Sequence, residues 1–171
     1  MTALLSLGSN LGDRLAHLRA ALAALEADIP HTAFSVAPVY ETEPVDVPAQ
    51  WAGQSYYNTA AALETDLAPD VLSTAVHAIE DRLGRRRIGY HAPRTIDIDI
   101  VAFGDARSSR PDLRLPHPEA ASRRFVLQPL ADIRPDFVLP GQTRTIAELL
   151  AALPPEPTVR RLDAAKLSVN G

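Results

Sequence analysis

Two aspartates in one short segment, Pro93-Arg94-Thr95-Ile96-Asp97-Ile98-Asp99-Ile100, carry the clearest chemical signal in the sequence. Side chains alternate along a β-strand, so the isoleucines face one way while Asp97 and Asp99 face the other. Residues two apart are separated by about 6.5–7 Å, so both carboxylates reach one cation or a metal pair about 3.5–4 Å apart. A solvated strand face is the alternative, although aspartate is a poor strand former and like charges repel without a cation between them. The spacing therefore favours a divalent-cation site.

Arginines surround this segment. Arg94 precedes the predicted strand, and Arg85 and Arg87 lie in the loop that leads into it. Sixteen of the 17 basic residues are arginine. This bias either reflects a GC-rich genome or serves an anion site, because the planar guanidinium group suits phosphate. Each arginine alone is more often a solvated surface residue. A site for magnesium and a polyphosphate needs carboxylates that hold the cation and guanidinium groups that hold the anion. The two kinds of side chain lie close together in this segment.

Further candidates for ligand contact lie outside this segment. His117 lies between two prolines, which restrict its backbone and so orient its ring. The ring either donates to a phosphate oxygen or caps a turn. No other histidine or cysteine lies nearby at the spacing of zinc ligands, which argues against a zinc site. Asn58 begins a predicted strand, where its amide either reads the edge of a flat heterocycle or forms a turn. Tyr56 and Phe125 are ordinary core candidates.

The composition excludes several classes of protein. The chain has 171 residues, 17 basic and 21 acidic side chains, a formal charge of −4 and no cysteine. At roughly 150 residues per domain this predicts a single domain, and the hydrophobic content of 46% is typical of a globular chain. The lack of cysteine excludes disulfides, thiolate metal sites and a cysteine nucleophile, and it fits a reducing compartment.

Charge and hydropathy predict the compartment of the protein and the classes of partner that it does not bind. The mild negative charge argues against a nucleic-acid groove. The N-terminus lacks the pattern of a secretory signal, and no apolar run approaches the roughly 20 residues that span a bilayer. We therefore expect a cytoplasmic protein with no nucleic-acid or membrane partner. A monomer is a separate expectation.

Apolar periodicity predicts alternating strands and helices around these residues. Gly8 ends the first strand, and Gly84 and Pro154 end later elements. The predicted strands are 4–8, 56–63 and 95–103, with β-forming residues also at 34–39; the predicted helices are 15–25, 69–83 and 146–153. Residues 43–55 and 85–93 are predicted loops, residues 115–130 read as turns mixed with short apolar pieces, and the tail from Pro154 is weakly specified.

Several motifs together resemble one family, 6-hydroxymethyl-7,8-dihydropterin pyrophosphokinase of folate biosynthesis. The resemblance spans about residues 4–140, in order. The motifs are Leu7-Gly8-Ser9-Asn10-Leu11-Gly12-Asp13-Arg14, Tyr40-Glu41-Thr42-Glu43-Pro44, Tyr57-Asn58, Glu80 with Gly84-Arg85-Arg86-Arg87, Pro93 to Asp99, and Leu115-Pro116-His117-Pro118 with Arg123 and Phe125.

The resemblance implies a ferredoxin-like α/β (α+β) fold, with an antiparallel sheet, helices packed outside and three mobile loops around a cleft. It implies that Asp97 and Asp99 bind two magnesium ions that bridge the phosphates of ATP, with Arg85 and Arg94 as the other catalytic residues. The ATP-binding residues implied are Glu80, Arg85, Arg87, Arg94, Ile100, His117 and Arg123. The pterin-binding residues implied are Tyr56 and Phe125, which stack on the ring, and Asn58, Thr42, Pro44 and Val45, which read its edge.

The implied reaction is attack of the pterin hydroxymethyl oxygen on the β-phosphorus of ATP, with AMP as the leaving group. Two rival hypotheses stay open. A non-catalytic pterin- or nucleotide-binding relative would bind both ligands and release no AMP, and a two-metal nucleotidyl transferase would release pyrophosphate. The chain departs from the family pattern at Asp46, where a glycine is usual, and in the loop around Tyr90 and His91, which lacks a tryptophan seen in some members.

Overall fold

A computed structural model describes residues 1–43, 49, 55–84 and 95–162 of the chain. The elements in chain order are β1 (Thr2–Ser9), α1 (Arg14–Asp28), β2 (Ala33–Val36), β3 (Tyr40–Thr42), β4 (Tyr56–Glu64), α2 (Pro69–Arg82), β5 (Asp97–Phe103), β6 (Ser108–Arg110), β7 (Leu113–Leu115), the 3-10 helix η2 (Ala120–Ser122), α3 (Arg124–Ile133), α4 (Ile146–Ala152) and β8 (Val159–Arg161).

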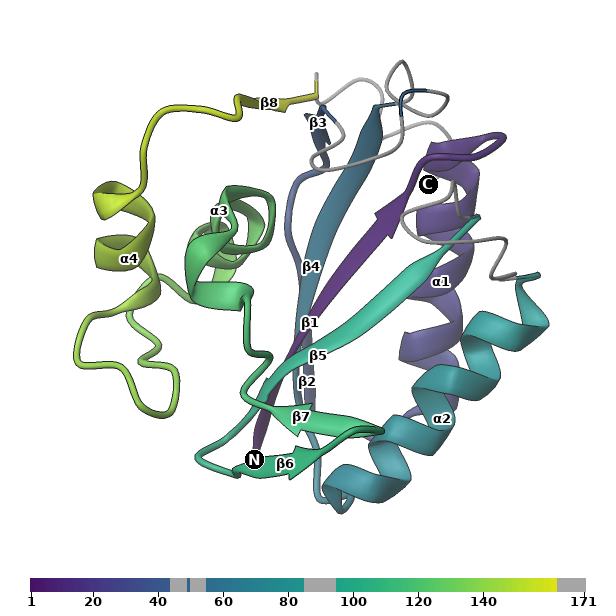
Figure 1. Ribbon diagram of the computed structural model, residues 1–171. Coiled ribbons are helices and arrows are strands. Elements are labelled where there is room, and N and C mark those ends of the chain that lie inside the picture. Colours follow the sequence, from purple (N-terminus) through teal and green to yellow (C-terminus); the bar gives the residue numbers. More distant parts are fainter. Residues whose placement is uncertain (44–48, 50–54, 85–94, 163–171) are drawn as a thin grey trace.

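An antiparallel sheet organises the molecule in three layers. Its strands run in the order β5-β1-β4-β3-β8, and β2 pairs with the far end of β4. Helices α1 and α2 cover one face, α3 and α4 lie over the other, and the β6–β7 hairpin lies beside β5 (Figure 1). The expected α+β fold, with an antiparallel sheet and helices outside it, is therefore confirmed. None of the helices in the described ranges combines the length and apolarity needed to cross a bilayer.

Alternating side chains of β1 divide the core between the two faces of the sheet. Leu5 and Leu7 pack with Leu18 of α1 and Ile79 of α2, whereas Leu4 packs on the α3 side. All five side chains are at most 1% exposed, and full burial of each leucine or isoleucine contributes about 1.5–3 kcal/mol. Both faces of the sheet are therefore anchored, which fixes its register.

The predicted start of the first helix and the predicted start and stop of the second are confirmed, and α1 extends three residues beyond the predicted 15–25. The carboxylate of Asp13 accepts the Ala16 N–H at 3.1 Å and so caps α1. Pro69 occupies the first turn of α2, and Gly84 follows its end at φ +85°, a conformation that favours glycine. The short helix predicted at 146–153 is confirmed as α4, whose capping box joins Thr145 and Glu148.

Residues 115–130 differ from the prediction because much of this segment is helical. Pro129 lies inside α3, where it removes one backbone hydrogen bond and breaks the usual sequence pattern of a helix. Burial of Val126, Leu127 and Leu130 against the sheet offsets that loss. The hairpin β6–β7 and strand β8 were also not predicted, since three-residue strands carry too little periodicity to identify.

The alternation predicted for 95–103 holds only as far as Ile100. Register shifts between Leu4 and Leu5 in the β1–β5 pairing, which is a β-bulge. Beyond it, Val101 and Ala102 both join the core on the α3 side, and Phe103 returns to the α1–α2 side. The aspartates precede the bulge, so their predicted placement is unaffected.

Candidate active site

Asp97 and Asp99 lie on one face of β5, as predicted, and that face is the one α3 covers. In the antiparallel pairing Asp97 is opposite Gly8 and Asp99 is opposite Ser6. Gly8 is in turn opposite Asn58 of β4. Directly opposite residues project to the same side of a sheet, so these residues form rows across three strands. Both aspartates are half-buried.

Glycine at position 8 creates a flat floor between the carboxylates and Asn58. A Cβ at this position would lie 2.8 Å from Oδ1 of Asn58, closer than real Cβ atoms approach. Asn58 is 4% exposed, and its Nδ2 donates to Oγ1 of Thr42 at 2.7 Å. This bond orients the amide, and Tyr56 adjoins the same floor, 3.9 Å from the position of that Cβ. The platform suits a flat ring with a polar edge.

A second set of predicted residues lies at the start of α3, with Arg123 as its N-cap and Phe125 in its first turn. The guanidinium of Arg123 forms an ion pair with Glu119 and lies 5.6 Å from the centroid of the Phe125 ring. Phe125 packs partly buried against the core beneath α3, and α3 contacts β1, β3 and β4. An aromatic ring and a guanidinium group therefore lie next to each other at the start of α3.

A buried tyrosine links α3 to the sheet. Tyr40 lies opposite Asn58 in the β3–β4 pairing, and its hydroxyl donates to Oδ2 of Asp132 at 2.5 Å. Burial raises the pKa of Tyr40 to about 12, and the hydrogen bond and negative charge of Asp132 act in the same direction. The neutral phenol is therefore the form that holds α3 in place.

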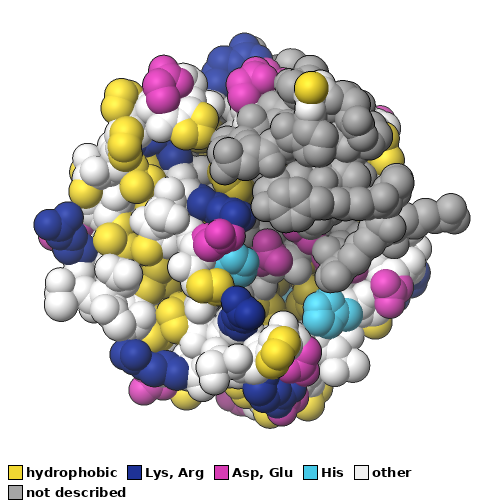
Figure 2. Space-filling view, viewed as in Figure 1, with side chains coloured by type: hydrophobic (Ala, Val, Ile, Leu, Met, Phe, Trp, Pro, Cys, Tyr) yellow, Lys and Arg dark blue, Asp and Glu magenta, His cyan; other side chains and the backbone are white. Residues whose placement is uncertain are grey.

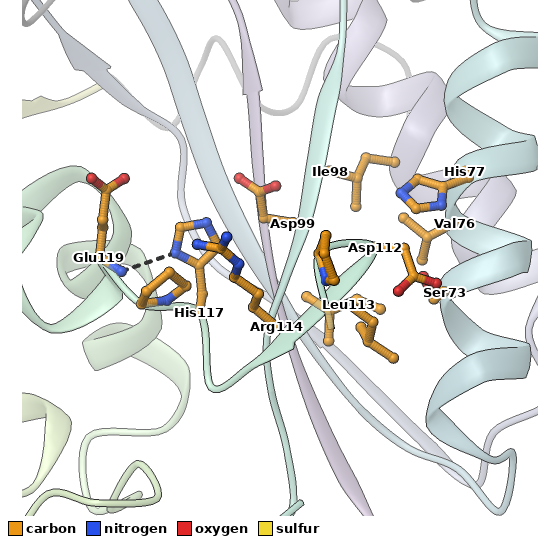
Figure 3. A pocket seen from close by; sticks show the side chains of 13 residues that line it. Ser73, Val76, His77, Ile98, Asp99, Asp112, Leu113, Arg114, His117 and Glu119 are labelled. Atoms are coloured by element: carbon orange, nitrogen blue, oxygen red, sulfur yellow. Dashed lines mark hydrogen bonds between the residues drawn. The ribbon is translucent and has the colours of Figure 1, made fainter. Parts of the chain in front are cut away.

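A cavity of about 490 Å³ opens beside Asp99, at the edge of β5. This volume lies within the range of small-molecule sites. Its apolar lining includes Ile100 and Leu113, and its polar lining includes Arg114 and His117; α2 contributes Ser73, Val76 and His77 (Figure 3). On the surface, histidine, basic and acidic side chains gather near the centre of this face of the molecule (Figure 2). The cavity suits a ligand with an apolar body and charged substituents.

His117 is held as a hydrogen-bond donor toward this cavity. Its backbone N–H donates to the carbonyl of Val101 at 2.8 Å, and its Nδ1 accepts the Glu119 N–H at 3.2 Å. Burial lowers the pKa of His117, and the positive charge of Arg123 adds to this effect against the opposing charges of Glu119 and Asp97. The neutral ring therefore predominates at neutral pH, with its proton on Nε2.

The donor set fits magnesium bound together with a phosphate ligand. Among the described residues, no group of three or more His, Cys, Asp or Glu side chains is placed to hold a metal ion. Magnesium prefers oxygen donors and usually takes one or two carboxylates, completing its shell with waters and substrate phosphates. Asp97 and Asp99 supply that share, and they would hold the ion only in company with a substrate.

Asp99, Ile100 and His117 line the cavity, and Asp97 lies on the same face of β5 as Asp99. Asn58 bonds to Thr42 on the floor that Tyr56 adjoins. Arg123 lies beside Phe125, and its charge acts on His117. Arg85, Arg87, Arg94, Pro44 and Val45 lie outside the described residues, so their roles stay predictions. Glu80 is 2% exposed and accepts the Ile98 N–H, and its predicted contact with ATP also stays a prediction.

Several cavity residues were missed by the sequence reasoning. Arg114 lies on β7, where the alternation of Leu113, Arg114 and Leu115 before a proline fits a short strand but is too brief to identify one. His77 and Ser73 lie one and two turns before Glu80 on α2. Their spacing on one helix face was visible, but nothing local indicates that this face borders a cavity.

The chain matches the family model described as 7,8-dihydro-6-hydroxymethylpterin-pyrophosphokinase (HPPK) over residues 4–135. It is 42% identical over 161 residues to a 2-amino-4-hydroxy-6-hydroxymethyldihydropteridine pyrophosphokinase of Pseudomonas aeruginosa, which covers 94% of this chain and 96% of the relative. A protein of the same name from Methylorubrum extorquens is 40% identical over 154 residues, covering 90% and 94%.

A solved structure supports the fold. The crystal structure of Plasmodium falciparum HPPK-DHPS wild type with pteroate gives a TM-score of 0.69 at 15% identity. The match covers 88% of this chain and 44% of that chain, so the present chain spans less than half of the solved one. At this identity the likeness concerns the fold alone.

Proposed function

Because the chain belongs to the 7,8-dihydro-6-hydroxymethylpterin-pyrophosphokinase (HPPK) family, we propose that it transfers pyrophosphate from ATP to 6-hydroxymethyl-7,8-dihydropterin. The products would be AMP and the pterin diphosphate used in folate biosynthesis. The observation that carries this proposal is the in-register row Asp97–Gly8–Asn58, which places a carboxylate, a flat floor and an amide on neighbouring strands.

The two substrates enter this row from opposite sides. The cavity at the edge of β5 takes the nucleoside of ATP, with Ile100 against the base and His117 and Arg123 toward the phosphates. The floor at Gly8 takes the pterin, between Tyr56 and Phe125. Asp97 and Asp99 lie between the two, where the triphosphate meets the hydroxymethyl group.

The chain's own residues then align and neutralise the reacting groups. The amide of Asn58, oriented by Thr42, pairs with the polar edge of the pterin, and Pro44 and Val45 follow in the same segment. The Nε2–H of His117 donates to the nucleotide, and Arg85, Arg87 and Arg94 contact the phosphates. Two magnesium ions held by the aspartate pair would supply charge neutralisation of the triphosphate. Alignment and charge stabilisation suffice for phosphoryl transfer, so a strong general base is not needed.

Product analysis tests this function directly. The full chain is incubated with ATP, magnesium and 6-hydroxymethyl-7,8-dihydropterin, and the products are followed by phosphorus NMR. AMP and the pterin diphosphate, formed in equal amounts, support the proposal. Pyrophosphate release supports a nucleotidyl transferase instead, and binding of both ligands without AMP supports a non-catalytic relative. That relative is not favoured, because both aspartates are present on one face of β5.

The remaining parts of the proposal concern setting and assembly. We place the reaction in the cytoplasm, since a chain without cysteine suits a reducing compartment. We also propose that residues 1–171 form one domain that acts as a monomer. Size-exclusion chromatography with light scattering tests the monomer, and a mass of twice 18.5 kDa would contradict it.

A further inference from the structure

A buried carboxylate from α2 bonds to the backbone between the two aspartates. Glu80 is 2% exposed, and its Oε2 accepts the N–H of Ile98 at 2.9 Å. Ile98 separates Asp97 from Asp99 in sequence. A buried glutamate is uncommon, because the charged side chain loses its hydration, so this contact needs a physical reason.

The position of β5 in the sheet supplies part of that reason. In the described sheet β5 is the outer strand beside β1, and alternate N–H groups of an outer strand point away from the sheet. The Ile98 N–H is such a group. A buried amide without an acceptor costs about 1–3 kcal/mol, and a bond to a charged acceptor is shorter and stronger than one to a neutral acceptor. Glu80 therefore fixes this edge of β5 more firmly than solvent would.

The contact also fixes the geometry of the aspartate pair. Asp97 and Asp99 project from β5 to the α3 side, and Ile98 packs on the α1–α2 side between them. Because Ile98 lies between Asp97 and Asp99, the position of its backbone sets the separation and orientation of the two carboxylates. We propose that Glu80 is a positioning residue, which holds the aspartate pair in the arrangement that magnesium and the triphosphate require. This inference rests on the proposed function.

The same helix face borders the nucleoside cavity. Ser73 and His77 line the cavity, and they precede Glu80 on α2 by seven and three residues, which places all three on one side of the helix. Glu80 therefore ties the cavity wall to the strand that carries the carboxylates. The hydrogen bond between Glu80 and Ile98 therefore sets the distance between the proposed nucleoside cavity and the aspartate pair that would hold the cations.

Two substitutions separate the hydrogen bond from the charge. Glu80→Gln keeps an acceptor oxygen at the same reach and removes the charge, whereas Glu80→Asp keeps the charge on a side chain one methylene shorter. Ile79→Ala is the matched control, because Ile79 is 1% exposed on the same helix and its loss destabilises the core without removing the bond. Each variant is titrated by calorimetry with α,β-methylene-ATP and magnesium, and with AMP in EDTA.

We expect Glu80→Asp to weaken magnesium-dependent binding of the analogue by about 10–100-fold, the range seen when a supporting contact to a metal ligand is lost. Glu80→Gln stays within about threefold of the wild type, and AMP binding without magnesium is unchanged in both variants. Amide hydrogen exchange at Ile98 provides an independent readout: protection falls in Glu80→Asp and persists in Glu80→Gln and Ile79→Ala.

Each other outcome overturns the proposal. Normal binding by Glu80→Asp with weak binding by Glu80→Gln assigns the role to charge, and equal loss of AMP binding assigns Glu80 to direct nucleoside contact. If Glu80→Gln fails to fold, Glu80 has only a structural role. The same conclusion follows if Glu80→Asp matches Ile79→Ala in analogue binding and in amide exchange at Ile98. The wild-type AMP assay is scored separately, so an inactive chain that passes these titrations contradicts the proposed function and leaves the positioning role standing.

Discussion

Replacing Gly8 with alanine tests the floor on which the pterin is proposed to lie. The new Cβ would be 2.8 Å from Oδ1 of Asn58, whereas ordinary contact begins at 3.4 Å, so the amide has to retreat by about 0.6 Å. Asn58 is buried, and its Nδ2 bonds to Thr42 at 2.7 Å, so the retreat disturbs a short, aligned hydrogen bond. The substitution therefore removes both the flat surface and the orientation of the amide.

The expected magnitudes follow from this geometry. Overpacking a buried site costs about 1–3 kcal/mol, and alanine in place of glycine in a strand returns about 0.5–1 kcal/mol. We expect Gly8→Ala to lower the free energy of unfolding by up to about 2.5 kcal/mol, a loss that leaves most domains folded. Pterin binding falls at least tenfold, about 1.4 kcal/mol or more, because the ring and its polar edge both lose their contacts.

Calorimetry with the pterin, in the presence of magnesium and α,β-methylene-ATP, measures this loss. Binding of the nucleotide analogue alone serves as the internal control, and it stays within about threefold because the cavity lies beyond the edge of β5. The double variant Gly8→Ala/Asn58→Ala relieves the clash, so it recovers stability relative to the sum of the two single variants while pterin binding stays weak. Wild-type pterin affinity in Gly8→Ala would refute the floor and its use by the ring.

Further predictions concern the carboxylates, the stacking ring and the tyrosine link. Asp97→Asn should lower AMP release by about a thousandfold or more at any magnesium concentration while the melting temperature is kept, and full activity would remove the metal-site claim. Phe125→Ala should weaken pterin binding by about 1–3 kcal/mol in the same calorimetric assay, and an unchanged dissociation constant would exclude stacking. Tyr40 has a folded pKa of about 12, above its ordinary value of 10.0, so its stabilisation is full below pH 10 and is lost as the pH rises through 12. Denaturant unfolding of the wild type should show a fall in the free energy of unfolding of up to about 3 kcal/mol over this pH range, and Tyr40→Phe should not show it. Equal pH profiles of stability in the two proteins would contradict the role of the Tyr40–Asp132 hydrogen bond.

Local patterns were enough to predict the elements that carry the aspartates and the first helices. The leucines of α1 recur at helical spacing behind the Asp13 cap, and Pro69 and Gly84 bracket α2. The alternation around Asp97 depends only on strand geometry. Each of these features is decided by residues within a few positions of one another, which is why sequence alone predicts them.

The site as a whole depends on contacts between segments far apart in the chain. Arg123 and Phe125 reach the sheet because α3 packs there despite Pro129, and Tyr40 meets Asp132 across 92 positions. The cavity needs α2, β5 and the β6–β7 hairpin together. No short pattern encodes such packing, so the resemblance to a family indicated these residues while residue chemistry left His117 and Asn58 undecided.

Strand register sets the spacing of the row Asp97–Gly8–Asn58 and the face on which the aspartates lie. Neighbouring strands lie about 4.7–4.9 Å apart, so the two steps from Asp97 through Gly8 to Asn58 span about 10 Å. In the proposed function, that span holds the reacting phosphate and the hydroxymethyl group between the carboxylates and the pterin ring. A slip of one residue would turn Asp97 and Asp99 to the α1–α2 side, where their charges would be buried in the apolar core. The pairing of β1 with β5 is regular from Gly8 to Leu5 and shifts only beyond it, so the irregularity is kept out of the part of the sheet that carries the chemistry.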